Sequence, residues 1–208
     1  NPSVTGLADG GYVVTWDSEG QDGSSTGVYA QVYGPSGLPS GESFQVHTTT
    51  YYYQLEPSVT SLEDGGFIVT WKGLYDAGSW DYGVFGQRYD ASGAAKGDEF
   101  VINTYTSGNQ YEPSVAPHGD GFVVTWRDDS GYDGGSGADI RGQLFDGSGT
   151  PVGDAFMVNS YTNSSQYDSS VAALDNGGFV VSWTSDGQDG NGSGVYSQRY
   201  DANGTPLS

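Results

Sequence analysis

The chain has 208 residues and a formal net charge of −20, with 26 acidic residues against 6 Lys and Arg, which excludes a nucleic-acid-binding protein because phosphate recognition needs a basic face. The absence of cysteine excludes a disulfide scaffold, a thiolate zinc site and a cysteine nucleophile. Apolar runs are only a few residues long and no targeting segment is visible, so we expect no membrane insertion.

The first 50 residues predict short strands separated by turns. Gly10 and Gly11 follow the first apolar run and favour a tight hairpin. The next run is rich in β-branched and aromatic side chains, which favour a strand, and a long polar loop follows at 17–27. The expected strands of this segment are residues 3–7, 12–16, 28–33 and 44–47.

This pattern recurs along the chain with a period of 55 to 57 residues. Trp16, for example, has counterparts at Trp71, Trp126 and Trp183. The fourth copy stops before its equivalent of Phe44, so the last repeat is truncated. We expect a single repeat domain over 1–208, with repeats at approximately 1–56, 57–112, 113–168 and 169–208.

Four antiparallel strands per repeat predict an all-β fold, and a β-propeller or propeller-like array of four repeats is favoured. On the second strand of repeat two, Phe67, Val69 and Trp71 share one face while Ile68 and Thr70 share the other. Both faces are largely apolar, as expected for a sheet packed on both sides. A β-solenoid and tandem sandwiches remain as alternatives.

Several segments resemble tandem repeats of very large secreted bacterial proteins, the RTX-type (hemolysin-type calcium-binding) surface proteins and related secreted enzymes. The segments are Gly-Gly-Phe-Val-Val-Ser-Trp at 177–183, Asp-Gly-Gln-Asp-Gly at 186–190 and Gly-Val-Tyr-Ser-Gln-Arg-Tyr-Asp-Ala at 194–202. The resemblance implies a secreted or cell-surface accessory module. Because the chain starts at Asn1, we expect a piece of a longer protein. The nonapeptide signature of the calcium β-roll is absent from the sequence.

Acidic, glycine-rich loops follow the tryptophan strands and suggest calcium binding. Calcium takes six to eight oxygen ligands, and flexible glycine-rich backbone can bring carbonyl groups close to an ion. The alternative is that these loops are simply solvated and keep the protein soluble. The candidate ligands are Asp17, Glu19, Asp22, Asp128, Asp133, Asp186, Asp189 and Asn191.

Aromatic side chains are abundant, and one group suggests ligand recognition. The repeated tryptophans lie at strand ends among apolar residues and are expected in the core. Trp80 occurs in one repeat only, inside a polar loop with Tyr75 and Tyr82. Flat aromatic side chains stack on sugar rings, so these three residues are the candidate ligand contacts, against a local packing role.

Catalytic equipment is sparse, and we do not expect an enzyme. His47 and His118 have no sequence context for a triad or a metal cage, and carboxylates occur in every loop. We therefore expect a non-enzymatic module that binds an extracellular polysaccharide. Binding of collagen or another matrix protein, as an accessory domain of a secreted protease, and a calcium-stiffened spacer of an adhesin are the alternatives. A homodimer could complete a larger ring.

Overall fold

The computed structural model describes residues 1–23, 25–50, 52–75, 80–131, 134 and 136–208. These residues form sixteen strands in four separate four-stranded sheets, and they contain no helix. The described part of the chain accordingly holds no helix able to cross a membrane.

The first two sheets each contain four antiparallel strands in sequence order. Their strands are β1 (Ser3–Gly6), β2 (Tyr12–Glu19), β3 (Thr26–Tyr33), β4 (Phe44–Gln45), β5 (Leu55–Ser61), β6 (Phe67–Leu74), β7 (Tyr82–Tyr89) and β8 (Ala95–Val101).

The other two sheets repeat this order. Their strands are β9 (Gln110–His118), β10 (Gly121–Asp128), β11 (Asp139–Phe145), β12 (Pro151–Met157), β13 (Gln166–Ala173), β14 (Phe179–Asp186), β15 (Ser193–Tyr200) and β16 (Pro206–Leu207).

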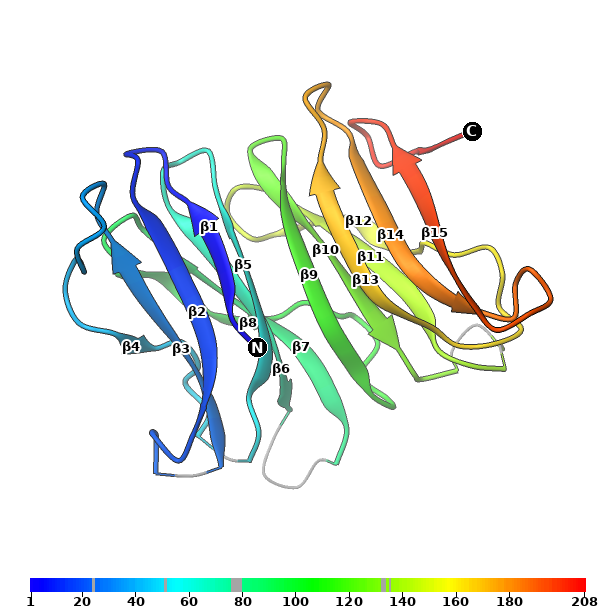
Figure 1. The fold of residues 1–208 in the computed structure, drawn as a ribbon, viewed down its shortest axis with the longest axis horizontal. Coiled ribbons are helices and arrows are strands. Elements are labelled where there is room, and N and C mark those ends of the chain that lie inside the picture. The colour runs from blue at the N-terminus through cyan, green and yellow to red at the C-terminus, as the bar shows by residue number, and fades with distance from the viewer. Residues whose placement is uncertain (24, 51, 76–79, 132–133, 135) are drawn as a thin grey trace.

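The four sheets stand side by side like the blades of a fan, in chain order from one end to the other (Figure 1). The first strands of neighbouring sheets contact each other, β1 with β5, β5 with β9 and β9 with β13, so these strands lie along the inner edge. The predicted propeller-like array of four repeats is confirmed.

Glycine-containing hairpins connect the first and second strands of each sheet. Gly10 has a φ of +87°, a conformation that side chains disfavour, and the Gly11 amide donates to the Asp9 carboxylate at 2.8 Å. A Cβ on Gly11 would lie 2.4 Å from the carbonyl oxygen of Tyr33, so the hairpin closes tightly against β3 only with glycine there. The predicted turn is confirmed.

Three hydrophobic clusters fill the spaces between neighbouring sheets. Successive side chains of β6 point to opposite faces, so the second sheet contributes to two of these clusters. Phe67, Val69 and Trp71 pack toward the first sheet, whereas Ile68 packs toward the third. This confirms the predicted two-sided packing. The repeated glutamines are structural too, since Gln87 Nε2, for example, donates to the carbonyl of Arg88 and to that of Gly97 on β8.

The strand boundaries differ from the prediction in two ways. The second and third strands run further, to Glu19 and from Thr26 in the first sheet, so the loop between them is shorter than 17–27. The last sheet also has a fourth strand, β16, which pairs with β15. This strand lies before the position equivalent to Phe44, so the truncation of the last repeat leaves it in place.

Candidate functional site

Repeat three departs from the other repeats at three neighbouring positions. Asp128 replaces Ser18, Gly73 and Ser185 of the other repeats. Asp139 replaces Gly27, Gly83 and Gly194, and Arg141 replaces Tyr29, Phe85 and Tyr196. Asp128 and Asp139 face each other at the adjoining ends of β10 and β11, and Arg141 faces Trp126. The repeats therefore differ where a polar cluster stands in the third sheet.

Asp128 and Arg141 form a buried ion pair. Arg141 Nε donates to Asp128 Oδ2 at 3.0 Å, and both side chains are almost completely buried. The other carboxylate oxygen accepts the amide of Ser130 at 2.8 Å and a longer contact from Gln110 Nε2 at 3.4 Å. A buried charge needs such partners, and here the carboxylate is held in one orientation by several of them.

Asp139 lies in a different electrostatic setting. Burial raises the pKa of its carboxyl, and the charge of Asp128 acts in the same direction. The amide of Asn159 opposes this by donating to Asp139 Oδ1 at 2.7 Å. The cluster thus combines a carboxylate paired with arginine and a second carboxyl group whose ionisation is disfavoured.

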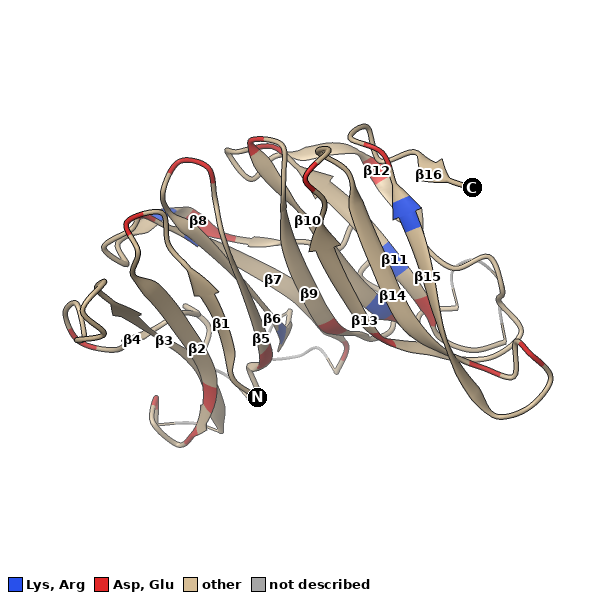
Figure 2. Cartoon of the chain, turned by 45° about the horizontal axis from the view of Figure 1, so that its top comes forward, with Lys and Arg blue, Asp and Glu red and all other residues tan. Residues whose placement is uncertain are grey.

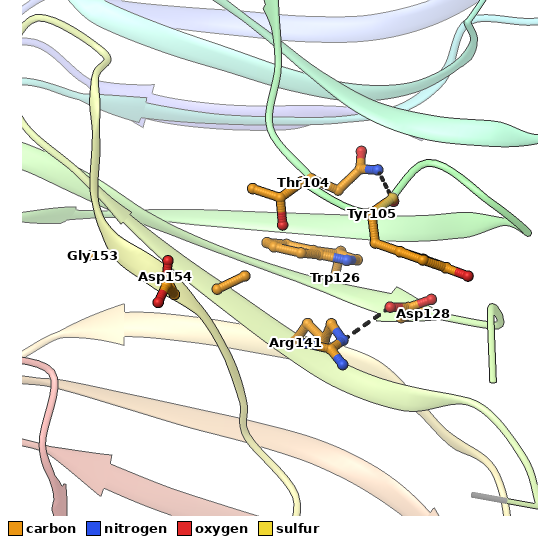
Figure 3. A pocket seen from close by; sticks show the side chains of 9 residues that line it. Thr104, Tyr105, Trp126, Asp128, Arg141, Gly153 and Asp154 are labelled. Carbon is orange, nitrogen blue, oxygen red and sulfur yellow. Dashed lines mark hydrogen bonds and ion pairs between the residues drawn. The ribbon is translucent and has the colours of Figure 1, made fainter. Parts of the chain in front are cut away.

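A cavity of about 410 Å³ opens between the second and third sheets beside this cluster. Figure 3 shows Thr104 and Tyr105, from the segment after β8, around the indole of Trp126 and the Arg141–Asp128 pair. Gly153, Asp154 and Ala155 of β12, together with Asn103, complete the lining. The size is in the range of small-ligand sites, and the lining mixes aromatic and polar groups.

Trp126 differs from its counterpart in the second sheet. Trp71 stacks on Phe85, with ring centroids 6.2 Å apart, and its indole Nε1 donates to Gln54. Trp126 faces Arg141 instead of an aromatic ring. Within the described chain, Trp126 Nε1 is buried without a hydrogen-bond partner. A buried donor of this kind is expected to bind water or a ligand.

Gln54 accepts from the indole of Trp71, but the equivalent glutamine of the next repeat has different partners. Gln110, the equivalent of Gln54, accepts from the hydroxyl of Tyr75 at 2.8 Å and from Asn103 Nδ2 at 3.0 Å. Because Gln110 also reaches Asp128, one polar network joins two predicted site residues, Tyr75 and Asp128. Tyr75 packs on Phe85 in the interior, so it supports the cavity instead of presenting a free ring.

Of the other two aromatic candidates, Trp80 lies just before β7 and Tyr82 is the first residue of that strand. Trp80 is 83% exposed and lies 6.5 Å from the ring of Tyr52, measured between centroids. Tyr82 is half-buried, with the Lys72 ammonium 5.3 Å from its ring centroid and Tyr111 beside it. Trp80 therefore offers an open ring face, and Tyr82 is enclosed by neighbours.

The candidate calcium ligands lie apart in the structure. Asp17 pairs with the terminal ammonium of Asn1 at 2.8 Å, and Asp22 is buried 3.9 Å from His47. Among the described residues, no three His, Asp or Glu side chains form a group that could hold a metal ion.

The remaining candidates serve local contacts. Asp186 accepts from Tyr167 and Ser193, and the Asn191 amide donates to Asp189 at 3.1 Å, as in an ordinary turn. Glu19 is exposed at the end of β2. Asp133 lies outside the described residues. Calcium binding stays a prediction.

The charge distribution affects which ligands the cavity can attract. Acidic residues lie mainly in loops and at strand ends, on all four sheets (Figure 2). Five of the cations are held in ion pairs with carboxylates, and Arg199 is exposed on β15. The field around the cavity is therefore negative overall.

Arg141 and Asp139 were missed as candidates from the sequence, although a signal was present. The position two residues before each repeated glutamine is aromatic in three repeats and arginine in the third. A position that breaks a repeat in this way marks a side chain with a local role. The positions that the repeats share form the scaffold, and the candidate site lies where the repeats differ.

No family model and no curated protein matches the sequence. Solved structures do match. A protein of unknown function from Dyadobacter fermentans has a TM-score of 0.67 and 13% identity, over 99% of this chain and 66% of that one. An α-L-arabinofuranosidase from Fusarium graminearum has a TM-score of 0.70 and 11% identity, over 98% and 63%. An endo-arabinase from Bacteroides thetaiotaomicron has a TM-score of 0.57 and 15% identity, over 100% and 74%.

At these identities the matches establish the fold and nothing finer. This chain spans 63 to 74% of the length of the three structures. Two of the three are carbohydrate-active enzymes by name, so the propeller-like fold of this chain is one that such enzymes use.

Proposed function

We propose that this chain is a non-enzymatic module that binds a neutral polysaccharide in the cavity between the second and third sheets. The observation that carries the proposal is the polar cluster of Asp128, Asp139 and Arg141 beside Trp126, present in one repeat of four. A repeated scaffold that changes three neighbouring residues at one cavity is typical of a binding site. The fold shared with carbohydrate-active enzymes supports a sugar as the ligand.

Sugar hydroxyl groups fit the donors and acceptors around the cavity. The Asp154 carboxylate on β12 is exposed and can accept from hydroxyls, and the hydroxyl of Thr104, which is exposed in the cavity lining, can donate. The ring of Tyr105 supplies an apolar surface for a sugar face. Trp80 is exposed just before β7 and contacts Tyr52, so it offers a separate aromatic surface outside the lining of the cavity.

A neutral ligand follows from the charge. The chain carries a net charge of −20, and Arg141 is already paired with Asp128. A uronic-acid or sulfated polysaccharide would be repelled at low ionic strength. We therefore expect neutral chains to bind and polyanionic chains to bind weakly or not at all.

Binding without cleavage is inferred from the state of the carboxyl groups. Glycoside hydrolysis needs an acid and a base or nucleophile on either side of one bond. Asp128 is held by Arg141 and by the backbone amide of Ser130, so the pair of Asp128 and Asp139 lacks a carboxylate free to act as base or nucleophile. We place the module in a secreted or cell-surface bacterial protein, on the basis of its resemblance to RTX-type repeats.

Affinity gel electrophoresis against neutral arabinan and xylan and against a sulfated polysaccharide tests the proposal. We expect retention by a neutral polymer, with Asp154→Ala and Tyr105→Ala each weakening binding by about tenfold, equivalent to about 1.4 kcal/mol. Asp98→Ala and Tyr161→Ala, the same changes in neighbouring repeats, are the matched controls and should leave retention unchanged.

Three outcomes would contradict the proposal. Release of reducing ends from the retained polymer would show an enzyme. Retention by insoluble collagen but by no polysaccharide would favour the matrix-protein alternative. No retention by either would favour a spacer.

We also propose that calcium stabilises the acidic loops. The support is the charge of −20 and the oxygen-rich, glycine-rich sequence around Asp186 and Asp189. Thermal melting with excess calcium should then give a melting temperature a few degrees above that in magnesium or chelator. Equal melting temperatures in the two cations would contradict it.

A further inference from the structure

Asparagine is followed directly by glycine at three places in the sequence, all of them in the fourth repeat. The pairs are Asn176-Gly177, Asn191-Gly192 and Asn203-Gly204. Such a pair can convert spontaneously, because the backbone nitrogen of the glycine can attack the asparagine side chain and glycine has no side chain that hinders the attack. The three pairs have different surroundings in the structure, so their reactivities can be compared.

The attacking nitrogen of the first pair is held in a hairpin. The Gly177 amide donates to the carbonyl of Leu174 at 3.0 Å, in the turn between β13 and β14. The Asn176 side chain is held as well, because its Oδ1 accepts from the Gly178 amide at 3.2 Å. Asp9 makes the same contact in the first sheet, so this arrangement belongs to the repeated scaffold.

The third pair lies in the turn between β15 and β16 and is held in a similar way. The Gly204 amide donates to the carbonyl of Asp201 at 3.1 Å, and equivalent bonds close this turn in the other three sheets. The turn is also crowded, since a Cβ on Gly204 would lie 2.8 Å from Leu144 Cδ1. In both hairpins the glycine nitrogen must leave a hydrogen bond before it can attack, which requires local opening of the turn.

The second pair, Asn191 and Gly192, lies in the loop between β14 and β15. Asn191 is exposed, and its backbone amide donates to Asp189 Oδ1 at 3.1 Å. The carbonyl of Gly192 accepts from the Gly187 amide at 2.7 Å, but the Gly192 amide itself donates to no group in the described part of the chain. A Cβ on Gly192 would meet no atom of a non-neighbouring residue within 4 Å. The attacking nitrogen is therefore available and has room around it.

This openness belongs to the loop and does not depend on the fourth sheet being the last one described. The equivalent loop of the first repeat has the same closing bond, from the Gly20 amide to the carbonyl of Ser25 at 2.6 Å, although another sheet follows it. A Cβ on Gly20 or Gly23 of that loop would likewise meet no atom within 4 Å.

We propose that Asn191 is a site of spontaneous modification, at which the side-chain amide becomes a carboxyl group. The Gly192 nitrogen forms a bond to Asn191 Cγ and loses its proton to a base in solution. The Cγ–Nδ2 bond breaks, and the nitrogen leaves as ammonia after taking a proton from water. Water then opens the succinimide ring to aspartate or isoaspartate, so water is the only co-reactant. The product places a carboxyl group beside those of Asp186 and Asp189, outside the lining of the cavity.

Incubation of the folded chain in mildly alkaline buffer, followed by digestion at acidic pH and peptide mapping by mass spectrometry, tests the proposal. We expect Asn191 to be converted about tenfold faster than Asn176 or Asn203, equivalent to about 1.4 kcal/mol of activation free energy. The same chain unfolded in guanidinium chloride is the control. Its three pairs should convert at similar rates, because the hairpin hydrogen bonds are then absent.

Two variants test the assignment to Asn191. Over the time in which the wild type acquires a more acidic band on isoelectric focusing, Asn191→Gln should acquire none, because a glutamine side chain would have to close a larger ring. Asn176→Asp is the matched control and should still acquire the band, since Asp9 shows that this turn accepts a carboxylate. Melting temperatures show whether each variant is folded.

Four outcomes would overturn the proposal. The first is a wild-type chain in which Asn191 is not converted, and the second is conversion of the three pairs at equal rates in the folded chain. The third is a preference for Asn191 that persists in the unfolded chain, because the structure would then not be its cause. The fourth is an acidic band that forms in Asn191→Gln at the wild-type rate.

Discussion

The second and third sheets have the same arrangement of strands but different side chains around the repeated tryptophan. In the second sheet, Trp71 is enclosed between Phe85 and Gln54, and the contact is mainly apolar. In the third sheet, Trp126 borders a cavity, and Arg141 stands where Phe85 would be. The repeated positions hold the array together, so the scaffold tolerates the few changed side chains that form a polar cluster beside the cavity. The predictions below test whether the two sheets differ as this comparison requires.

The largest loss of unfolding free energy should appear when the tryptophan of either sheet is replaced by alanine. Trp71→Ala leaves a void in a closed core and should cost about 3–5 kcal/mol of unfolding free energy. Trp126→Ala should cost about 1 kcal/mol less, because the indole of Trp126 borders the cavity and has no hydrogen bond to lose. Urea unfolding followed by circular dichroism measures both. Equal losses would show that the cavity does not loosen the packing of Trp126.

The next prediction concerns variants that give the third sheet the residues found in the other repeats. Arg141→Tyr leaves Asp128 buried without its cation and should destabilise the protein by about 3 kcal/mol. Adding Asp128→Ser, the residue of repeats one and four, should recover most of this loss. Urea unfolding in a double-mutant cycle gives the coupling between the two residues. Both variants should lose polysaccharide binding.

The double variant separates stability from function. If it were stable and still bound the polysaccharide, the polar cluster would have no part in the site. A double variant as unstable as Arg141→Tyr would show that the ion pair is not the reason for the loss.

The repeats made most of the architecture predictable from the sequence. Four copies of a Gly-Gly turn, a β-branched strand and a tryptophan predict four similar sheets, and the alternation at Phe67, Ile68 and Val69 predicts that each internal sheet packs on both faces. Strand ends were less predictable, since pairing with a neighbour extends a strand beyond its apolar residues, as at Asp17–Glu19. Local patterns decide the fold here because each repeat packs only on its neighbours.

The candidate site was less predictable because it depends on contacts between repeats. Loop composition gave Asp128 and Tyr75, but it could not show that Gln110 joins them from another strand. The acids of one loop also look equivalent in sequence. In the structure their surroundings differ, since the Asp22 side chain is buried 3.9 Å from His47 whereas Glu19 is exposed at the end of β2.

The prediction with the smallest expected effect concerns a position at which the first repeat differs from the second and third. His47 occupies the place of Asn103 and Asn159, whose amide oxygens accept from backbone amides of the same sheet. The His47 ring is buried, its Nδ1 lies 2.7 Å from the carbonyl of Thr49, and its Nε2 faces Asp22. Because a carbonyl can only accept, Nδ1 carries the proton in the neutral ring.

Burial lowers the pKa of His47 below its usual value near 6.5, and this outweighs the opposing effects of Thr49 and Asp22. The unfolded chain then binds a proton at a higher pH than the folded chain. The contribution of His47 to stability is therefore fully present above about pH 6.5 and is lost as the pH falls below that value. His118 is half-buried, and partial burial lowers its pKa in the same direction, so it adds to the same trend.

Melting temperatures between pH 7.5 and 5.0 measure this effect. We expect His47→Asn to melt like the wild type above pH 7 and to lose less stability than the wild type as the pH falls. His118→Asn is the matched control, which removes the less enclosed of the two rings and should give a smaller change. Identical pH profiles for the wild type and His47→Asn would mean that the Asp22 charge compensates burial fully, and the first sheet would then behave at this position as the asparagine-containing sheets do.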